Sequence, residues 1–357
     1  MDPGGVGFEF YLEFCLSQYP RNQILCKLVT PHGSFDFLFG GIVIFSRFFY
    51  DVSDFLSALE QQQGRIFSIP PVPDFEWSAF LSAAAVLFSS FIGFDAIAQT
   101  GSEALNPRRN LPLAILIAIL GVGMFYFLFT ASVYSIIPWS FVAEQAQIKD
   151  ITAPGLLSYV LPNGIDTLII LGATLALIND LPAMLLSVSR LMFAWAKDGI
   201  MPKQLTAIDP KKHTPIMALA AAGILSSIGV LGSNFAGDFF LGIDIMVTSM
   251  LVNFLLMSIT LLTIKKHNLE LYLNIEVLKN RPIQLFIGWG GVVFLSSFLV
   301  IHLYKDLTNP VAAWYFHSTY VWLIVMGMAT LVFIYQWNKM KIKDVGYRNK
   351  FKKLPIE

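Results

Sequence analysis

The sequence predicts an all-α integral membrane protein with about seven transmembrane helices. Of the 357 residues, 55% are hydrophobic and only 13% are charged, whereas a soluble domain carries roughly a quarter charged residues. Several stretches without any charged residue exceed the roughly 20 residues that an apolar helix needs to cross a bilayer. These long runs decide the class of protein before any motif is considered.

The expected membrane spans follow one another from Trp77 onward. Four contain no charged residue, namely 111–143, 214–237, 282–304 and 308–338. Three more are interrupted only by carboxylates: 77–102 by Asp95, 163–189 by Asp166 and Asp180, and 239–264 by Asp244.

The residues before the first span differ in character. Their one apolar stretch, 37–46, is about ten residues long, which is too short to cross a bilayer, and we expect an interfacial helix or the remnant of one. The sequence therefore divides into an atypical N-terminal region (1–76), a transmembrane permease-like domain (77–337) and a basic tail (338–357).

The distribution of lysine and arginine predicts the orientation, because short cytoplasmic connections retain positive charge. Most cations follow the first, third, fifth and seventh spans, and the opposite connections and the stretch directly before the first span hold only Arg65, Lys149 and Lys305. We expect the C-terminal tail to be cytoplasmic. Its basic residues fit this topology and contact with membrane lipid, and we expect no nucleic-acid partner.

The first span carries the most informative pattern. Gly93 and Asp95 lie near the middle of an otherwise apolar helix, where a carboxylate costs roughly 2.5 to 3.5 kcal/mol and glycine weakens a helix by about 1 kcal/mol. Together they indicate a broken helix, whose free backbone groups could bind a charged ligand in a cavity. A continuous helix in which Gly93 lets a neighbour approach closely is the alternative.

Two stretches carry a resemblance to a known family. The segment FIGFDAIAQTGSEALNPRRNLPLAI resembles the sixth helix and following loop of the amino acid, polyamine and organocation (APC) transporter superfamily, and SRLMFAWAKDGIMPKQLTAIDPKKHTPIMAL resembles its signature at the end of the eighth helix. The resemblance implies a secondary-active permease for amino acids or related small organic amines. It also implies a LeuT-like fold of two inverted five-helix repeats followed by two accessory helices.

The resemblance covers only the second repeat and the accessory helices, so the first five-helix repeat is expected to be missing. In the family, a Gly-rich break in the first helix binds the substrate carboxylate. The chain is then either a fragment of a longer permease, or the partner of another polypeptide that supplies the first five helices. We expect location in the plasma membrane.

The resemblance also assigns site residues. It places the segment from Ser89 to Gly93 at the substrate-facing break, Asp95 just beyond it, and Met184 near the substrate, so that the substrate-binding set is Ser89, Ser90, Phe91, Ile92, Gly93, Asp95 and Met184. Some members of the family have a bulky aromatic gate where this chain has Ser89. A wider pocket, or a gate formed by Phe88 or Phe91, is therefore implied.

Asp180 is the most unusual residue in this comparison, because relatives carry a small or hydroxyl residue there beside a sodium-like site. Ionisable residues inside membranes mark functional sites by default, so we predict that Asp180 couples transport to H⁺ or Na⁺. The structural alternative is a carboxylate capped by Asn179 or held by a partner helix. No metal or other cofactor is expected.

The sequence leaves two alternative functions to consider. Asp95 and Asp244 could form the carboxylate pair of an intramembrane aspartyl protease, but Phe94 precedes Asp95, and the GID around Asp244 departs from the expected Gly-x-Gly-Asp. The fit is poor, and the sequence indicates a protein that is not an enzyme. A fragment or partner subunit that packs without transporting is the second rival.

Overall fold

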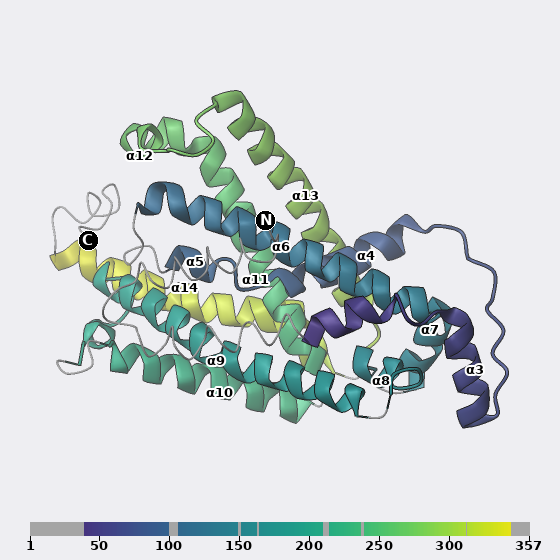
Figure 1. Ribbon diagram of the computed structural model, residues 1–357. Helices are drawn as coiled ribbons and strands as arrows, with labels where there is room; N and C mark the ends of the chain where they lie inside the picture. The colour runs from purple at the N-terminus through teal and green to yellow at the C-terminus, as the bar shows by residue number, and fades with distance from the viewer. Residues whose placement is uncertain are drawn as a thin grey trace. The chain divides into compact units, whose positions relative to one another are not determined.

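A computed structural model describes residues 39–99, 106–148, 151–162, 164–209, 214–236, 239–311 and 313–343. Every regular element within these ranges is a helix, and none is a β-strand (Figure 1). The predicted all-α class is therefore confirmed for the described part of the chain.

Within the described residues, six helical segments are long and apolar enough to cross a membrane. They are Trp77–Gln99, Pro107–Ile136, Ile165–Lys197, Leu241–His267, Arg281–Thr308 and Ser318–Ile342. The remaining predicted span, 214–237, corresponds to α10 (Ile216–Ala236), whose apolar part, Ile216–Gly232, is shorter.

The outer surfaces of the long helices are apolar. Large side chains such as Phe127, Phe286 and Leu331 are 68%, 81% and 68% exposed. Soluble monomers rarely expose continuous apolar surface of this extent, whereas lipid covers it at no cost. The exposure therefore agrees with an integral membrane protein.

The described residues form two compact units. The first combines residues 39–75 with Leu116–Ala183, and the second combines Glu76–Ile115 with the chain from Met184 onward. The long helices α6 (Pro107–Ile136) and α9 (Ile165–Lys197) each pass from one unit into the other.

The core of the first unit forms between short helices. One of them includes the last residues of the predicted span 111–143, because α6 already ends at Ile136. Phe55 and Leu59 lie one helical turn apart on α3 (Val52–Gln63) and are fully buried, as is Phe141 of α7 (Trp139–Ile148). Phe55 meets Phe141 edge to face at a centroid distance of 5.0 Å, and residues of α8 (Ala153–Leu157) join the same cluster. The N-terminal region thus shares a core with the connection between the second and third predicted spans.

Helix α3 has clear boundaries. The Asp51 carboxylate accepts from the amides of Ser53 and Asp54, and the Asp54 carboxylate accepts from the Asp51 amide, which forms a capping box. Gly64, with φ 63°, ends the helix in the left-handed conformation.

Polar contacts hold α3 to the rest of the first unit. Both guanidinium nitrogens of Arg65 reach the Glu144 carboxylate of α7, at 2.7 and 2.8 Å. The side-chain amide of Gln63 donates to the Tyr159 hydroxyl at 2.9 Å. The hydrogen bond from Arg65 lowers the pKa of Glu144, and the same bond raises the pKa of Arg65.

In the second unit, α11 (Phe239–His267) packs along α13 (Arg281–Thr308). A Cβ atom on Gly291 would lie only 2.6 Å from the Ser258 hydroxyl, and one on Gly288 would lie 2.7 Å from Leu262. Small residues at such positions let two membrane helices approach closely.

Arg281 fixes the start of α13 against α11. Its guanidinium donates to the carbonyl oxygens of Leu261 and Leu262, at 3.0 and 2.6 Å, and to the side chain of Gln284 at 3.0 Å. Gln284 is almost completely buried and donates in turn to the Leu278 carbonyl at 2.8 Å. The buried polar groups at this helix end therefore satisfy one another.

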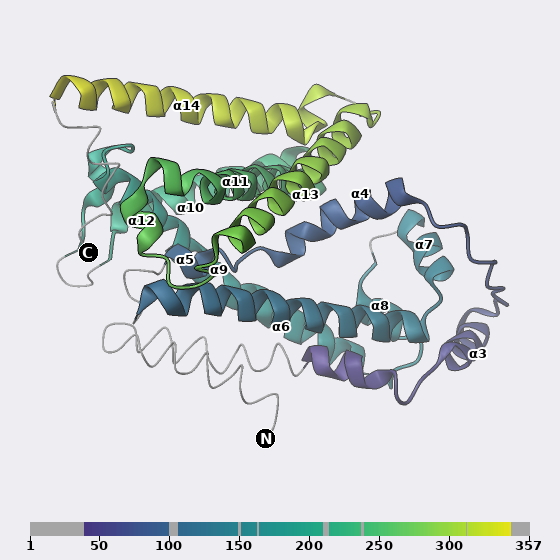
Figure 2. The ribbon, with the colours of Figure 1, turned by 90° about the horizontal axis from the view of Figure 1, so that it is seen from above.

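Figure 2 shows the turn that leads from α13 into α14 (Ser318–Lys343). A carboxylate also holds this turn. Asp306 accepts from the backbone amides of Ser318 and Thr319, at 3.0 and 2.9 Å, and its carbonyl lies 2.6 Å from Nδ1 of His317. Two of the first amides of α14, which lack helical acceptors, are thus satisfied.

Helix α9 extends beyond the span predicted over 163–189 and ends at Lys197. The amide of Gly199 donates to Ala196, and that of Ile200 donates to Trp195, with Gly199 at φ 87°. This is a Schellman motif, and it explains why the family-like sequence has glycine after Asp198.

Candidate functional site

The first predicted span is broken where the sequence indicated. Helix α4 (Trp77–Leu87) gives way to a 3₁₀ turn, η1 (Phe88–Phe91), before Ile92 becomes extended with φ −61° and ψ 144°. Gly93 follows with φ 113°, and helix resumes only with α5 (Ala96–Gln99). Figure 2 shows the interruption between α4 and α5. The alternative of a continuous helix is wrong, because Ile92 and Gly93 both leave the helical conformation. Glycine is suited to the second position, since any other side chain is strained at such a φ.

Local hydrogen bonds define the shape of the break. The amide of Ile92 donates to the Ser89 carbonyl, and that of Ala96 donates to the Gly93 carbonyl, both at 3.1 Å. Among the described residues, none donates a hydrogen bond to the Ile92 carbonyl. Within that part of the chain, a backbone acceptor without a donor therefore lies at the centre of the break.

The predicted site side chains at the break have distinct surroundings. Asp95 accepts from the Gly93 amide at 3.3 Å, so its carboxylate caps the turn. The Ser89 hydroxyl turns back onto the Val86 carbonyl at 2.7 Å, and Ser90 is exposed. Asp95 thus has a structural role at the break, in addition to the substrate role predicted from the sequence.

Phe254, an aromatic residue of α11, was not predicted from the sequence. Its ring stacks on Phe94 with a centroid distance of 5.2 Å and an interplanar angle of 19°, and it meets Phe88 edge to face at 6.0 Å and 79°. No local signal distinguishes Phe254 among the 31 phenylalanines of the chain. Only the packing of α11 against the break reveals it.

The two remaining predicted site residues lie on α9. Met184 is 36% exposed and belongs to the same unit as the break, whereas Asp180 belongs to the other unit and is exposed. Pro182, between them, lacks an amide hydrogen, so the Ile178 carbonyl has no helical donor. The roles of Met184 in substrate binding and of Asp180 in ion coupling stay predictions.

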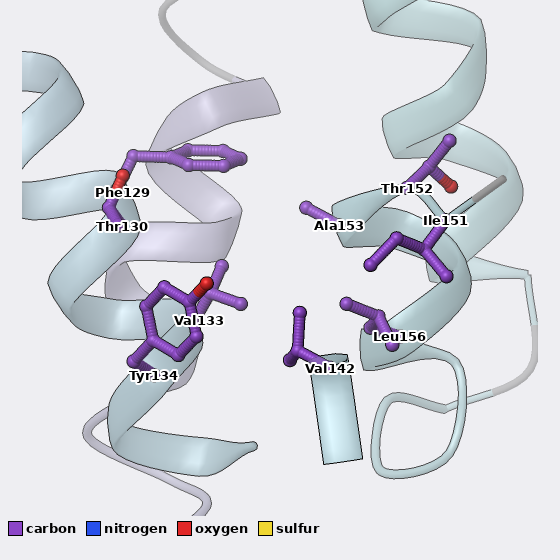
Figure 3. Close-up of a pocket in the computed structure, with 9 residues that line it drawn as sticks. All are labelled: Phe129, Thr130, Val133, Tyr134, Val142, Ile151, Thr152, Ala153 and Leu156. Carbon is purple, nitrogen blue, oxygen red and sulfur yellow. The ribbon is translucent and has the colours of Figure 1, made fainter. Parts of the chain in front are cut away.

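A cavity of about 140 Å³ lies in the first unit and involves none of the predicted site residues (Figure 3). Its walls come from α6, α7, α8 and the two residues before α8, and they are mostly apolar. The lining residues are Phe129, Thr130, Val133, Tyr134, Val142, Ile151, Thr152, Ala153 and Leu156. The side chains that the sequence assigned to substrate come from other segments of the chain.

The described part of the chain contains no group of three or more His, Cys, Asp or Glu side chains placed to hold a metal ion. Of the two aspartates considered as a protease pair, Asp95 caps the break through its carboxylate, whereas the backbone carbonyl of Asp244 lies 3.3 Å from Nε2 of the buried His302. The distinctive feature of the region around Asp95 is the interruption of the helix at Ile92 and Gly93.

Comparison with known proteins agrees with these features. The model of a family described as amino acid permease matches residues 35–344. The branched-chain amino acid permease BcaP of Bacillus subtilis is 34% identical over 156 residues, which are 43% of this chain and 31% of that protein.

Other relatives match different proportions of the chain. The vacuolar cationic amino acid transporter 4 of Arabidopsis thaliana is 29% identical over 43% of this chain and 25% of its own length. The aromatic amino acid transport protein AroP of Salmonella typhimurium is 23% identical over 71% of this chain and 54% of its own length. The chain thus spans between about a quarter and about half of these relatives.

Proposed function

Because the chain belongs to the amino acid permease family, we propose that it forms the substrate-binding second half of a secondary-active transporter for amino acids or related small amines. The single observation that supports this most strongly is the break at Ile92 and Gly93, which opens backbone groups within a membrane span. Membership in a permease family places the chain among transport proteins and not among enzymes, so the protease alternative is set aside.

The break offers the right chemistry for an amine. The Ile92 carbonyl carries partial negative charge and can accept a hydrogen bond from an ammonium group. Irregular backbone occurs at membrane depth only where it is buried in protein or lines a cavity. Ser89, Ser90, Phe91, Gly93 and Met184 would complete the substrate surroundings, and Asp95 would keep the turn in shape.

We propose that Asp180 couples transport to a proton or a sodium ion. It lies inside a predicted span, and the Ile178 carbonyl, freed by Pro182, lies on the preceding half turn of the same helix. A carboxylate and a free carbonyl are oxygen ligands of the kind that hard cations prefer.

Transport needs the helices that bind the substrate carboxylate in the family. These would come from a longer form of the protein or from a second polypeptide that supplies the first five helices. A fragment or subunit that packs without transporting is the competing function.

Uptake by reconstituted vesicles tests the proposal. Labelled leucine, arginine and phenylalanine represent the branched-chain, cationic and aromatic substrates in the names of the relatives. We expect uptake of at least one when the chain is reconstituted with an N-terminal half, and loss of uptake with Gly93→Leu. No uptake in any combination would favour the non-transporting subunit.

We also propose that the protein lies in the plasma membrane and that its C-terminus is cytoplasmic, the orientation that the distribution of cations suggests. Cysteines introduced at the exposed Gln147 and at Asn349, with Cys15 and Cys26 replaced by serine, test the orientation with an impermeant thiol reagent on intact cells. We expect Gln147→Cys to be labelled and Asn349→Cys to be protected. Labelling of both from the same side would contradict this topology.

A further inference from the structure

We infer that Phe254 of α11 is a positioning residue that holds the broken segment of the first span in its bent conformation. Phe88 precedes the break and Phe94 follows it, and both contact this one ring. Ile92 and Gly93, where the backbone changes direction, lie between them. A single side chain on another helix therefore fixes both arms of the break.

The break needs such an external support. The hydrogen bonds that form the turn join residues close in sequence, and the carboxylate of Asp95 reaches the Gly93 amide at 3.3 Å. At Gly93 itself no neighbouring atom lies within 4 Å of the position that a Cβ would occupy, so side-chain packing does not restrain the glycine. Contacts of the flanking aromatic rings with Phe254 therefore act together with the packing of α13 on α4 to restrain the angle between the arms.

The ring is a suitable anchor because α11 is itself held in place. Trp322 of α14 donates from its indole nitrogen to the Ser249 hydroxyl of α11 at 2.9 Å, five residues before Phe254. On another side, Gly288 and Gly291 allow close packing of α13 on α11. Phe254 therefore transmits the position of α11, set by α13 and α14, to the backbone of the break.

This role has a consequence for substrate that rests on the proposed function. A backbone carbonyl binds an ammonium group well only when it is held in the bound geometry beforehand, since any ordering during binding lowers the affinity. Loss of the Phe254 ring should therefore weaken substrate binding without removing any group that touches the substrate.

The experiment compares Phe254→Leu with Phe254→Tyr, which keeps the ring, and with Phe294→Leu, which removes an exposed ring from α13. Amide hydrogen exchange over residues 92–97 is measured on each purified protein in detergent. Leucine, arginine and phenylalanine binding is then measured on the chain reconstituted with an N-terminal half. Thermal unfolding verifies that each variant is folded.

For Phe254→Leu we expect roughly ten-fold faster exchange at 92–97 and roughly ten-fold weaker binding, as the loss of two aromatic contacts implies. Phe254→Tyr and Phe294→Leu should resemble the wild type in both measurements. Unchanged exchange in a folded Phe254→Leu protein, or faster exchange with unchanged affinity, would overturn the inference. Exchange needs no substrate, so it decides the positioning role even if the wild type binds no amino acid, a result that would instead reject the proposed function.

Discussion

Replacement of Gly93 by alanine measures directly whether the first span is broken. Gly93 has φ 113°, and no atom lies within 4 Å of the position that a Cβ would take. The methyl group therefore meets open space, and the whole cost of the substitution comes from the backbone conformation. Residues held in such sparsely populated regions cost about 1 to 3 kcal/mol, so we expect Gly93→Ala to destabilise the protein by this amount.

Gly223 provides a matched control. It also has no atom within 4 Å of its would-be Cβ, but it lies inside α10 and its φ is not positive. Alanine is more favourable than glycine within a helix by roughly 0.5 to 1 kcal/mol, so Gly223→Ala should stabilise the protein. The two substitutions are chemically identical, and the free energies of unfolding of the variants should differ by roughly 2 to 4 kcal/mol.

Equilibrium unfolding in mixed micelles, followed by circular dichroism as the sodium dodecyl sulfate content rises, measures both variants against the wild type. The signs matter more than the sizes, because Gly93→Ala should lower the free energy of unfolding and Gly223→Ala should raise it. If both variants were stabilised alike, Gly93 would have an ordinary helical conformation. The first span would then be continuous.

Three further predictions concern individual charged residues. Arg281→Lys should lower the free energy of unfolding by roughly 2 to 4 kcal/mol in the same assay, since two guanidinium nitrogens make the three hydrogen bonds and the one nitrogen of lysine cannot occupy both positions. A change near zero would show that these bonds contribute nothing. The hydrogen bond from Arg65 lowers the pKa of Glu144, so this ion pair stabilises the fold above the ordinary pKa of the carboxyl group and is lost as the pH falls through the lowered one. Thermal midpoints of wild type and Glu144→Gln should accordingly differ at pH 7 and converge in acid, whereas a constant difference would contradict the assignment. Asp180→Asn should preserve folding and substrate binding but remove the dependence of uptake on a proton or sodium gradient, and gradient-driven accumulation by this variant would reject the coupling role.

The sequence was sufficient to predict the membrane helices and the break, because both depend on local properties. A run of more than 20 residues without charge can be recognised directly in the sequence. A glycine and a carboxylate such as Gly93 and Asp95 are unusual within an apolar span and can be recognised in the same way. The predicted span over 163–189 is shorter than α9, since the span was measured by its apolar length and the helix continues past Arg190 to Lys197, two residues before Gly199.

The core of the first unit was not predicted, because it joins segments that are far apart in the chain. Phe55 and Phe141 are separated by 86 positions, and although Phe141 lies in the charge-free run 111–143, nothing in that run indicates its contact partner. A closer reading of local signals could have located α3, since Asp51 and Asp54 have the spacing of a capping box and Gly64 follows at its end. The contact partners of that helix could not have been found in the same way.

The break could be predicted from the sequence, whereas the residue proposed to support it could not, because its role depends on contacts between distant segments. A glycine and a carboxylate in an apolar helix are conspicuous because membrane helices exclude them unless they serve a purpose, whereas a phenylalanine in such a helix satisfies every local expectation. Phe254 differs from the other phenylalanines only in what it touches, namely Phe88 and Phe94. For a site built on backbone groups, the sequence therefore indicates where the helix is interrupted. It does not indicate the apolar contacts that hold the interrupted segment in position. Substitutions on α11 therefore test the site as directly as substitutions at Gly93.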